Sequence, residues 1–371
     1  MRPTRRILSF FWTALCVLVA SGAVSASPLE VPDVTLAPSN FLDIEVAPPL
    51  DFCGEAVPLE DPEIREDLEK EMLLTIWNRP QFILYVKRSG RYLPYIEKML
   101  RENRMPEDLK YVAIAESALL PHIGSHAGAV GYWQFIKWTG RRYGLRIDKE
   151  IDERRNIFAS TRAAIKYFQK LYGDFGSWTL AAAAYNMGEA GLGRRIAEQG
   201  TRDYYHLYLP LETQRYIFRI LAIKLILSDL PKYGFNLTEK DLYTPVAFDS
   251  VQVNLASSTP IRVIADAAGT YFKKIKDLNP EIRGNRLVKG KHVILVPKGA
   301  GKGFPKRLST LLAKAETQRD NRKKETYVVK HGDSLTMIAE RLGIPLRDLL
   351  QWNRLKYSST IHPGQQLVIL R

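Results

Sequence analysis

A single carboxylate, Glu116, stands in an otherwise apolar stretch of the chain. Three apolar residues precede it at the i, i+3, i+4 and i+7 spacing of one helix face: Leu109, Val112 and Ala113. Pro121 cannot continue a helix, so Glu116 is expected near the C-terminal end, where the helix dipole is negative. The dipole and the apolar neighbours both raise a carboxyl pKa, and a carboxylic acid protonated near neutral pH can act as a general acid. A structural carboxylate is the alternative for a lone Glu.

The residues after Glu116 suit a bound sugar. Gly124–Gly131 is rich in small residues, which let the backbone approach a ligand closely. Tyr132, Trp133 and Gln134 follow, and aromatic faces beside an amide match the apolar faces and polar rims of sugar rings. The stretch therefore predicts a glycan site next to the candidate acid.

Three motifs, in order along the chain, resemble the signatures of family 1 lytic transglycosylases. They are Glu116-Ser117 with Gly128-Ala129 and Gly131–Gln134, then Ala183–Gly188, then Glu212-Thr213 with Tyr216. The resemblance covers most of the chain after about Phe52. It extends to the membrane-bound lytic murein transglycosylase D type, whose members carry LysM modules after the catalytic domain.

The resemblance implies a lysozyme-like domain that cleaves the β-1,4 bond between N-acetylmuramic acid and N-acetylglucosamine in peptidoglycan. Ordinary glycosidases use two carboxylates, and the matched motifs offer only Glu116. Glu116 is therefore implied to act as acid and then as base, while the 6-hydroxyl of the sugar attacks and forms a 1,6-anhydro product. Glu212 is expected to be structural, and neither a cofactor nor a metal is implied. The residues implied to bind the substrate are Ser117, Tyr132, Gln134, Tyr185, Asn186 and Tyr216.

Three other functions remain as alternatives. A goose-type hydrolytic lysozyme on the same fold would differ only in its product. A non-catalytic peptidoglycan-binding scaffold would rely on the LysM modules, and the intact Glu116-Ser117 pair argues against it. Nucleic-acid binding is suggested by the net charge of +14. The absence of a basic-aromatic groove motif and an expected signal peptide argue against it, so glycan strands are the expected partner.

The chain is expected to be mainly α, with a lysozyme-like transglycosylase domain followed by small α+β LysM-type (βααβ) modules. Residues 1–26 read as a signal peptide, which predicts secretion across the inner membrane to a periplasmic, cell-wall-associated location. Lipidation of Cys16 and outer-membrane association are left open; Leu15 stands where a lipobox has a small residue. The further expected segments are a linker (27–50), an N-terminal helical extension (51–104), the transglycosylase domain (105–240), a degenerate LysM-like module (243–298), a basic linker (299–324) and a LysM module (325–371).

The two C-terminal modules are inferred from an internal repeat at an offset of 74 residues. The repeat aligns Ile264–Gly269 with Ile338–Gly343, Asn279 with Asn353, and Gly290 and Val293 with Gly364 and Leu367. Each copy reads strand, helix, helix, strand. The second copy resembles a LysM module, whereas the first has a weak leading strand and no Gly-Asp turn.

Helix boundaries follow from capping and breaking residues. The expected helices are Pro62–Arg79, Tyr92–Glu102 opening near Pro94, one starting at Pro106, Asn156–Tyr172 ended by Gly173, Trp178–Tyr185, Thr213–Leu227 and Pro305–Arg319.

Overall fold

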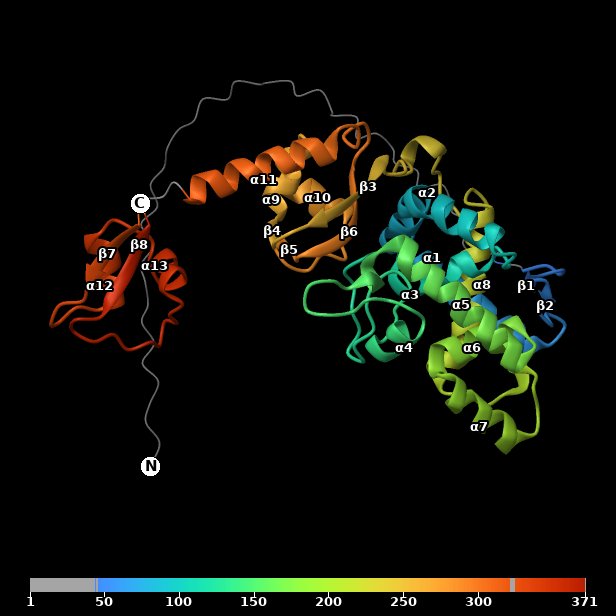
Figure 1. Cartoon of the computed structure of the whole chain (residues 1–371). Helices are drawn as coiled ribbons and strands as arrows, with labels where there is room; N and C mark the ends of the chain where they lie inside the picture. The colour runs from blue at the N-terminus through green and yellow to red at the C-terminus, as the bar shows by residue number, and fades with distance from the viewer. Residues whose placement is uncertain (1–43, 45, 321–323, 371) are drawn as a thin grey trace, which may run out of the picture. The chain divides into compact units, whose positions relative to one another are not determined.

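The computed structural model describes residue 44, residues 46–320 and residues 324–370. That part of the chain is mainly helical, with short two-stranded sheets (Figure 1), so the predicted fold class is confirmed. The expected signal peptide (1–26) and most of the expected linker (27–50) lie outside the described residues. Among the described residues, no helix combines the length and the apolar composition needed to cross a membrane.

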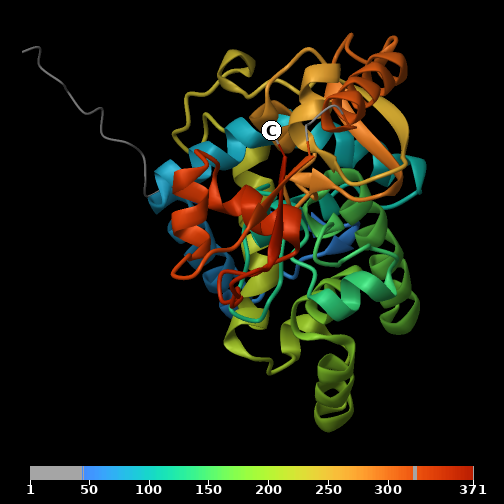
Figure 2. The same cartoon turned by 60° about the vertical axis from the view of Figure 1, so that its left-hand side comes forward.

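A β-ribbon and a group of helices form the first part of the chain. In Figure 2, α7 projects from the other helices of this group. The elements are β1 (Asp51–Phe52), β2 (Glu55–Ala56), α1 (Pro62–Trp77), α2 (Arg79–Glu102), α3 (Leu109–Ser117), α4 (Lys137–Arg142), η1 (Glu153–Arg155), α5 (Ile157–Phe175), α6 (Trp178–Met187), α7 (Glu189–Gln199), η2 (Tyr204–His206) and α8 (Leu211–Ser228).

One hydrophobic core unites these elements. It contains buried residues from Val46 to Phe235, including Leu68 of α1, Ile96 of α2 and Ile220 of α8. The helix α6 contacts both α5 and α8. Its run of four consecutive alanines, 181–184, is fully buried, so these small side chains let the helices approach closely.

The expected start of the second helix is wrong. Helix α2 begins at Arg79, and Pro94 lies inside it rather than near its start. Proline cannot donate the helical hydrogen bond to the carbonyl four residues earlier. Val86, Leu93 and Ile96 are nevertheless all buried, so apolar packing on both sides of Pro94 keeps the helix continuous.

Two further helix ends differ from expectation. Helix α3 begins at Leu109 rather than Pro106, because the preceding residues form a turn with a hydrogen bond of 3.0 Å from Lys110 N to Glu107 O. Helix α5 continues through Gly173 and ends at Phe175, capped by Gly176, whose φ of 67° is left-handed. A glycine costs a helix interior only about 1 kcal/mol, which the packing of α5 outweighs.

The middle module, residues 248–297, follows η3 (Glu239–Asp241) and has a βααβ order. The long strands β3 and β6 pair antiparallel, with Val251 opposite Ile294. Its elements are β3 (Phe248–Leu255), β4 (Thr259–Pro260), α9 (Ile261–Ala267), α10 (Phe272–Leu278), β5 (Arg286–Leu287) and β6 (Gly290–Pro297).

Helix α11 (Phe304–Asp320) falls within the stretch that the sequence assigns to a basic linker. Figure 1 shows it lying across α9, which it contacts. Phe304 and Leu308 are buried in the hydrophobic core of the middle module. The first turns of α11 therefore add to that core.

The C-terminal module repeats the βααβ order around its own core, and the two modules share a hydrogen-bonded asparagine. Asn279 accepts from Leu295 N and donates to Leu295 O, both at 2.8 Å. Asn353 bonds in the same way to Val368 N (2.6 Å) and Val368 O (2.9 Å). The module consists of β7 (Lys324–Val328), α12 (Leu335–Arg341), α13 (Leu346–Asn353) and β8 (Gln366–Leu370).

This shared bond corrects the alignment of the last strands. Leu295 corresponds to Val368, an offset of 73 rather than 74 residues. Buried Ile294 therefore corresponds to buried Leu367, whereas Val293, which the repeat aligned with Leu367, is 61% exposed. Side chains alternate between the faces of a strand, so a one-residue shift exchanges the buried and exposed sets.

Candidate active site

The candidate acid lies at the end of α3, as the spacing predicted. Leu109, Val112 and Ala113 are fully buried, and Glu116 is the penultimate residue of the helix. The helix ends before Pro121, because Ala118 and Leu119 both adopt left-handed backbone conformations, with φ of 53° and 58°. Two consecutive non-glycine residues in this region are strained, and such strain persists only where the surroundings enforce it.

The environment of Glu116 favours its protonated form. Burial is the main cause that raises the pKa of this carboxyl from 4.5 to about 7. The hydroxyl of Tyr216, which donates a hydrogen bond to Oε1, partly opposes this rise. The negative charge of Glu212 raises the pKa further, and the positive charge of Arg219 lowers it. A carboxyl with a pKa near 7 can both give and take a proton at neutral pH.

Ser117 joins the end of α3 to the loop that follows. Its hydroxyl lies 2.8 Å from the carbonyl oxygen of Tyr132 and 3.1 Å from that of Ala113. The side chain is buried, so its hydroxyl bonds to backbone carbonyls of the protein. Ser117 thereby holds the loop beside Glu116.

The loop from Gly128 to Phe135 is tightly fixed. A Cβ atom on Gly131, whose φ is 84°, would lie 2.0 Å from the carbonyl oxygen of Arg154, so no other residue fits there. Gln134 has a left-handed φ of 47°, and its Nε2 donates to the carbonyl of Gly131 at 2.8 Å. Strain of this kind is often found at ligand sites.

Tyr185 and Asn186, from α6, reach the same region. The hydroxyl of Tyr185 donates to the carbonyl of Trp133 at 2.5 Å, and its ring stacks on Phe168. Burial, and next the charge of Glu116, raise the pKa of Tyr185, so the phenol stays protonated. Asn186 Oδ1 accepts a hydrogen bond of 2.8 Å from Thr213 of α8.

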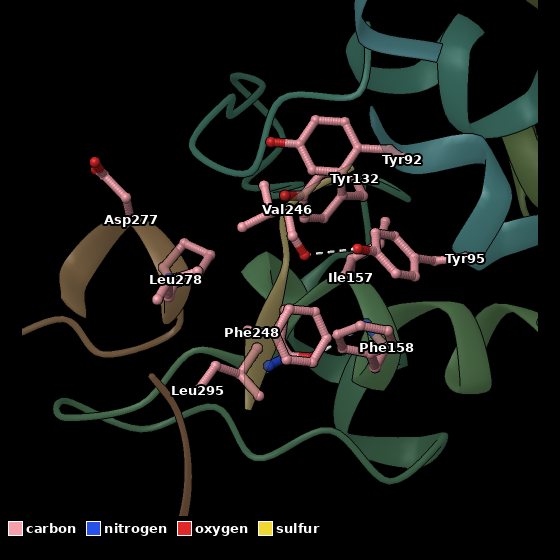
Figure 3. A pocket seen from close by; sticks show the side chains of 12 residues that line it. Tyr92, Tyr95, Tyr132, Ile157, Phe158, Val246, Phe248, Asp277, Leu278 and Leu295 are labelled. Carbon is pink, nitrogen blue, oxygen red and sulfur yellow. Dashed lines mark hydrogen bonds between the residues drawn. The ribbon is translucent and has the colours of Figure 1, made fainter. Parts of the chain in front are cut away.

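Two aromatic residues of the first motif lie in the interior. The ring of Tyr132 is 3% exposed, packs edge-to-face on Tyr92, and lines the pocket in Figure 3, which Glu116 does not line. Trp133 is 1% exposed and donates from Nε1 to Thr161 Oγ1 at 2.9 Å. The structure therefore brings the carbonyls of these residues, rather than their rings, to the Glu116 helix and Tyr185.

Other residues of the site were not predicted as functional. Arg154 donates from Nη1 to the carbonyls of Gly128 (2.9 Å) and Phe135 (3.0 Å), and it forms a buried ion pair with Asp152. A buried Arg pairs with a nearby carboxylate, so the spacing of Asp152 and Arg154 was the available signal. Among the described residues, no group of three or more His, Cys, Asp or Glu side chains could hold a metal ion.

Comparisons with known proteins define the class first. Residues 94–208 match the family described as Transglycosylase SLT domain, and residues 327–370 match the LysM domain. The chain is therefore a transglycosylase-domain protein with a C-terminal LysM module.

Curated relatives define the family. Membrane-bound lytic murein transglycosylase D of Escherichia coli (strain K12) is 35% identical over 86% of this chain and 72% of that protein. The chain belongs to the family of membrane-bound lytic murein transglycosylase D. Peptidoglycan transglycosylase gp16 of Escherichia phage T7 is 41% identical over 23% of this chain and 7% of that protein. The 70 kDa soluble lytic transglycosylase of Escherichia coli, a solved structure, aligns with a TM-score of 0.34 at 20% identity over 41% of this chain and 25% of that one, too low to support an argument.

Proposed function

We infer that the chain is a lytic transglycosylase that cleaves peptidoglycan. Its family and its transglycosylase domain support this activity. The single observation that carries the mechanism is Glu116, a carboxyl with a pKa raised to about 7 by burial and bonded to Tyr216. Such a group can serve as a general acid and, after losing its proton, as a general base.

The bond we propose as the target joins N-acetylmuramic acid to N-acetylglucosamine. Glu116 donates its proton to the glycosidic oxygen as the bond from that oxygen to C1 breaks. The N-acetyl group of the substrate stabilises the cation at C1, as in substrate-assisted glycosidases. The Glu116 carboxylate then takes the proton of the 6-hydroxyl group while the oxygen of that hydroxyl group bonds to C1. The product is a 1,6-anhydro sugar, no water is consumed, and Glu116 is again protonated.

The groups around Glu116 are proposed to orient this substrate. Asn186 uses Oδ1 to accept from Thr213, which leaves its Nδ2 group to donate to the N-acetyl carbonyl. Gln134 uses Nε2 for the loop, which leaves its Oε1 atom to accept from a sugar hydroxyl or amide. Tyr216 adjusts the acid directly, whereas Ser117 and Tyr185 hold the carbonyls of the loop.

The proposed location is the periplasm, at the cell wall. The LysM domain at residues 327–370 supports a role in holding the enzyme on glycan strands. A tether of this kind raises the local concentration of the catalytic domain at its substrate.

The test is the product. Purified sacculi digested with the full chain are expected to yield muropeptides that end in 1,6-anhydro-N-acetylmuramic acid, lighter by one water than hydrolytic products in mass spectrometry. Attack by the tethered 6-hydroxyl outcompetes water because of its high effective concentration. Reducing-end muropeptides as the main product would support a hydrolytic lysozyme instead. The Glu116→Gln variant, which cannot donate the proton, is the control for contaminating activity.

A further inference from the structure

The two βααβ modules of this chain have the same fold and the same asparagine bond but different surroundings. After Asn353, the corresponding residues of the C-terminal module are Arg354 and Lys356, which are exposed, and Leu355, which packs against the module's own core. After Asn279, the corresponding stretch Pro280–Ile282 is buried. The same part of the fold is therefore free in one module and covered in the other.

The stretch after Asn279 is covered by the segment that precedes α5. Ile282 forms a β-bridge with Ile151, and Asp152 N donates to the carbonyl of Glu281 at 2.9 Å. Arg283 N donates to the carbonyl of Glu150 at 2.8 Å. Ile151 belongs to the hydrophobic core of the middle module rather than to that of helices α1–α8. The contact thus combines backbone hydrogen bonds with apolar burial.

The middle module also meets the first part of the chain through aromatic packing. Phe248 packs edge-to-face on Phe158, with ring centroids 5.6 Å apart, and Tyr95 donates a hydrogen bond of 2.8 Å to the carbonyl of Val246. Figure 3 shows these side chains around one pocket, together with Tyr132 of the loop and Leu278 of the module. Residues of the module therefore line the same pocket as Tyr132, whose carbonyl oxygen accepts the hydrogen bond of Ser117.

The contact continues to the active-site loop through one ion pair. Asp152, whose backbone the module fixes, accepts from Arg154 Nε and Nη2, both at 2.8 Å. The remaining Arg154 nitrogen, Nη1, donates to the carbonyls of Gly128 and Phe135, at the two ends of the loop. Both side chains of the pair are less than 10% exposed, so water does not substitute for either.

We propose that the middle module is a working part of the catalytic unit and that Arg154 is a positioning residue through which it fixes the loop beside Glu116. This rests on the proposed transglycosylase function. The module, through residues 280–283, orients Asp152; Asp152 orients Arg154; and Arg154 holds the ends of the loop that carries Gln134. Of the two modules, the C-terminal one is then the module that binds glycan, because its stretch after Asn353 is not covered by the segment before α5.

The experiment uses the full chain with short soluble glycan fragments, and it measures kcat and KM separately. Ile282→Asp places a charge in the contact, and Arg154→Lys removes the forked bonds without touching the module. Each is expected to lower kcat roughly 10- to 100-fold, because a misplacement of about 1 Å can cost about 10²-fold. KM and sacculus binding are expected to stay within about twofold of wild type. Tyr271→Asp, an apolar-to-acid change at a 63% exposed site on the same module, is the matched control and should behave as wild type.

The double variant separates positioning from general damage. If Ile282 and Arg154 act along one path, Ile282→Asp/Arg154→Lys lowers kcat no further than the stronger single variant. If the double variant instead lowers kcat by the product of the two single effects, Ile282 and Arg154 act independently, and the single path is refuted. A folded Ile282→Asp protein with the same kcat as Tyr271→Asp would refute the proposal. If Ile282→Asp fails to fold, the test rests on Arg154→Lys. A kcat of this variant equal to that of wild type refutes the positioning role. Wild-type protein that makes no anhydro product would refute the proposed function instead.

Discussion

Replacing Glu116 by Gln is expected to make the protein more stable as well as inactive. The folded carboxyl has a pKa of about 7, against 4.5 for the free group. The folded state therefore disfavours the ionised form, and the wild type loses stability as the pH rises from about 4.5 through 7. With about 1.36 kcal/mol for each pH unit between the two pKa values, the loss reaches roughly 3 kcal/mol above pH 7.

The amide of the Glu116→Gln variant avoids this loss, because it cannot ionise and still accepts the hydrogen bond of Tyr216. Urea unfolding, followed by far-UV circular dichroism, should show the variant gaining about 1 kcal/mol over wild type at pH 5 and roughly 3 kcal/mol at pH 8. Cleavage should fall by at least the ~10²–10⁴-fold that a positioned acid contributes. Glu66→Gln, at an exposed site of α1 whose charge does not act on Glu116, is the control for loss of a carboxylate. A stability difference that does not change between pH 5 and 8 would refute the raised pKa.

Three further outcomes follow from the same structure. The value of kcat/KM should decline above about pH 7; Glu212→Gln should move this decline to lower pH and Arg219→Gln to higher pH, because these charges respectively raise and lower the pKa of Glu116, and unchanged profiles would contradict that arrangement. Deleting residues 326–371 should weaken pelleting with sacculi and leave turnover of short glycan fragments within about twofold, and a collapse of that turnover would make the module part of the catalytic unit. Asn279→Ala should lower the melting temperature of the middle module, because Leu295 N and Leu295 O would lose their partner, and an unchanged melting curve would contradict this.

The sequence predicted the position of Glu116 in its helix but not the way that helix ends. Apolar spacing and Pro121 were enough to put Glu116 at the end of a helix. The stop itself comes from Ala118 and Leu119, which carry no glycine or asparagine signal for a left-handed conformation. Tertiary contacts enforce that conformation, and local propensity cannot report them.

The roles within the first motif were also only partly predictable. Tyr132 and Trp133 looked like faces for a sugar, yet both rings are buried. An aromatic residue has the same sequence signal whether its ring meets a ligand or a core. The contact between Ile151 and Ile282 joins residues far apart in the sequence, and neither residue has a pattern that identifies its partner.

The hydrophobic core shared by α1 to α8 extends beyond the matched domain on both sides. Glu71 of α1 is 3% exposed and pairs with Arg215 and Arg219 of α8, on either side of Tyr216. A fragment cut to the matched domain, residues 94–208, would lose both α1 and α8, and with them the phenol that binds Glu116. Residues outside the matched domain therefore form part of the surroundings of Glu116, and a fragment made for expression or inhibitor screening has to keep both α1 and α8.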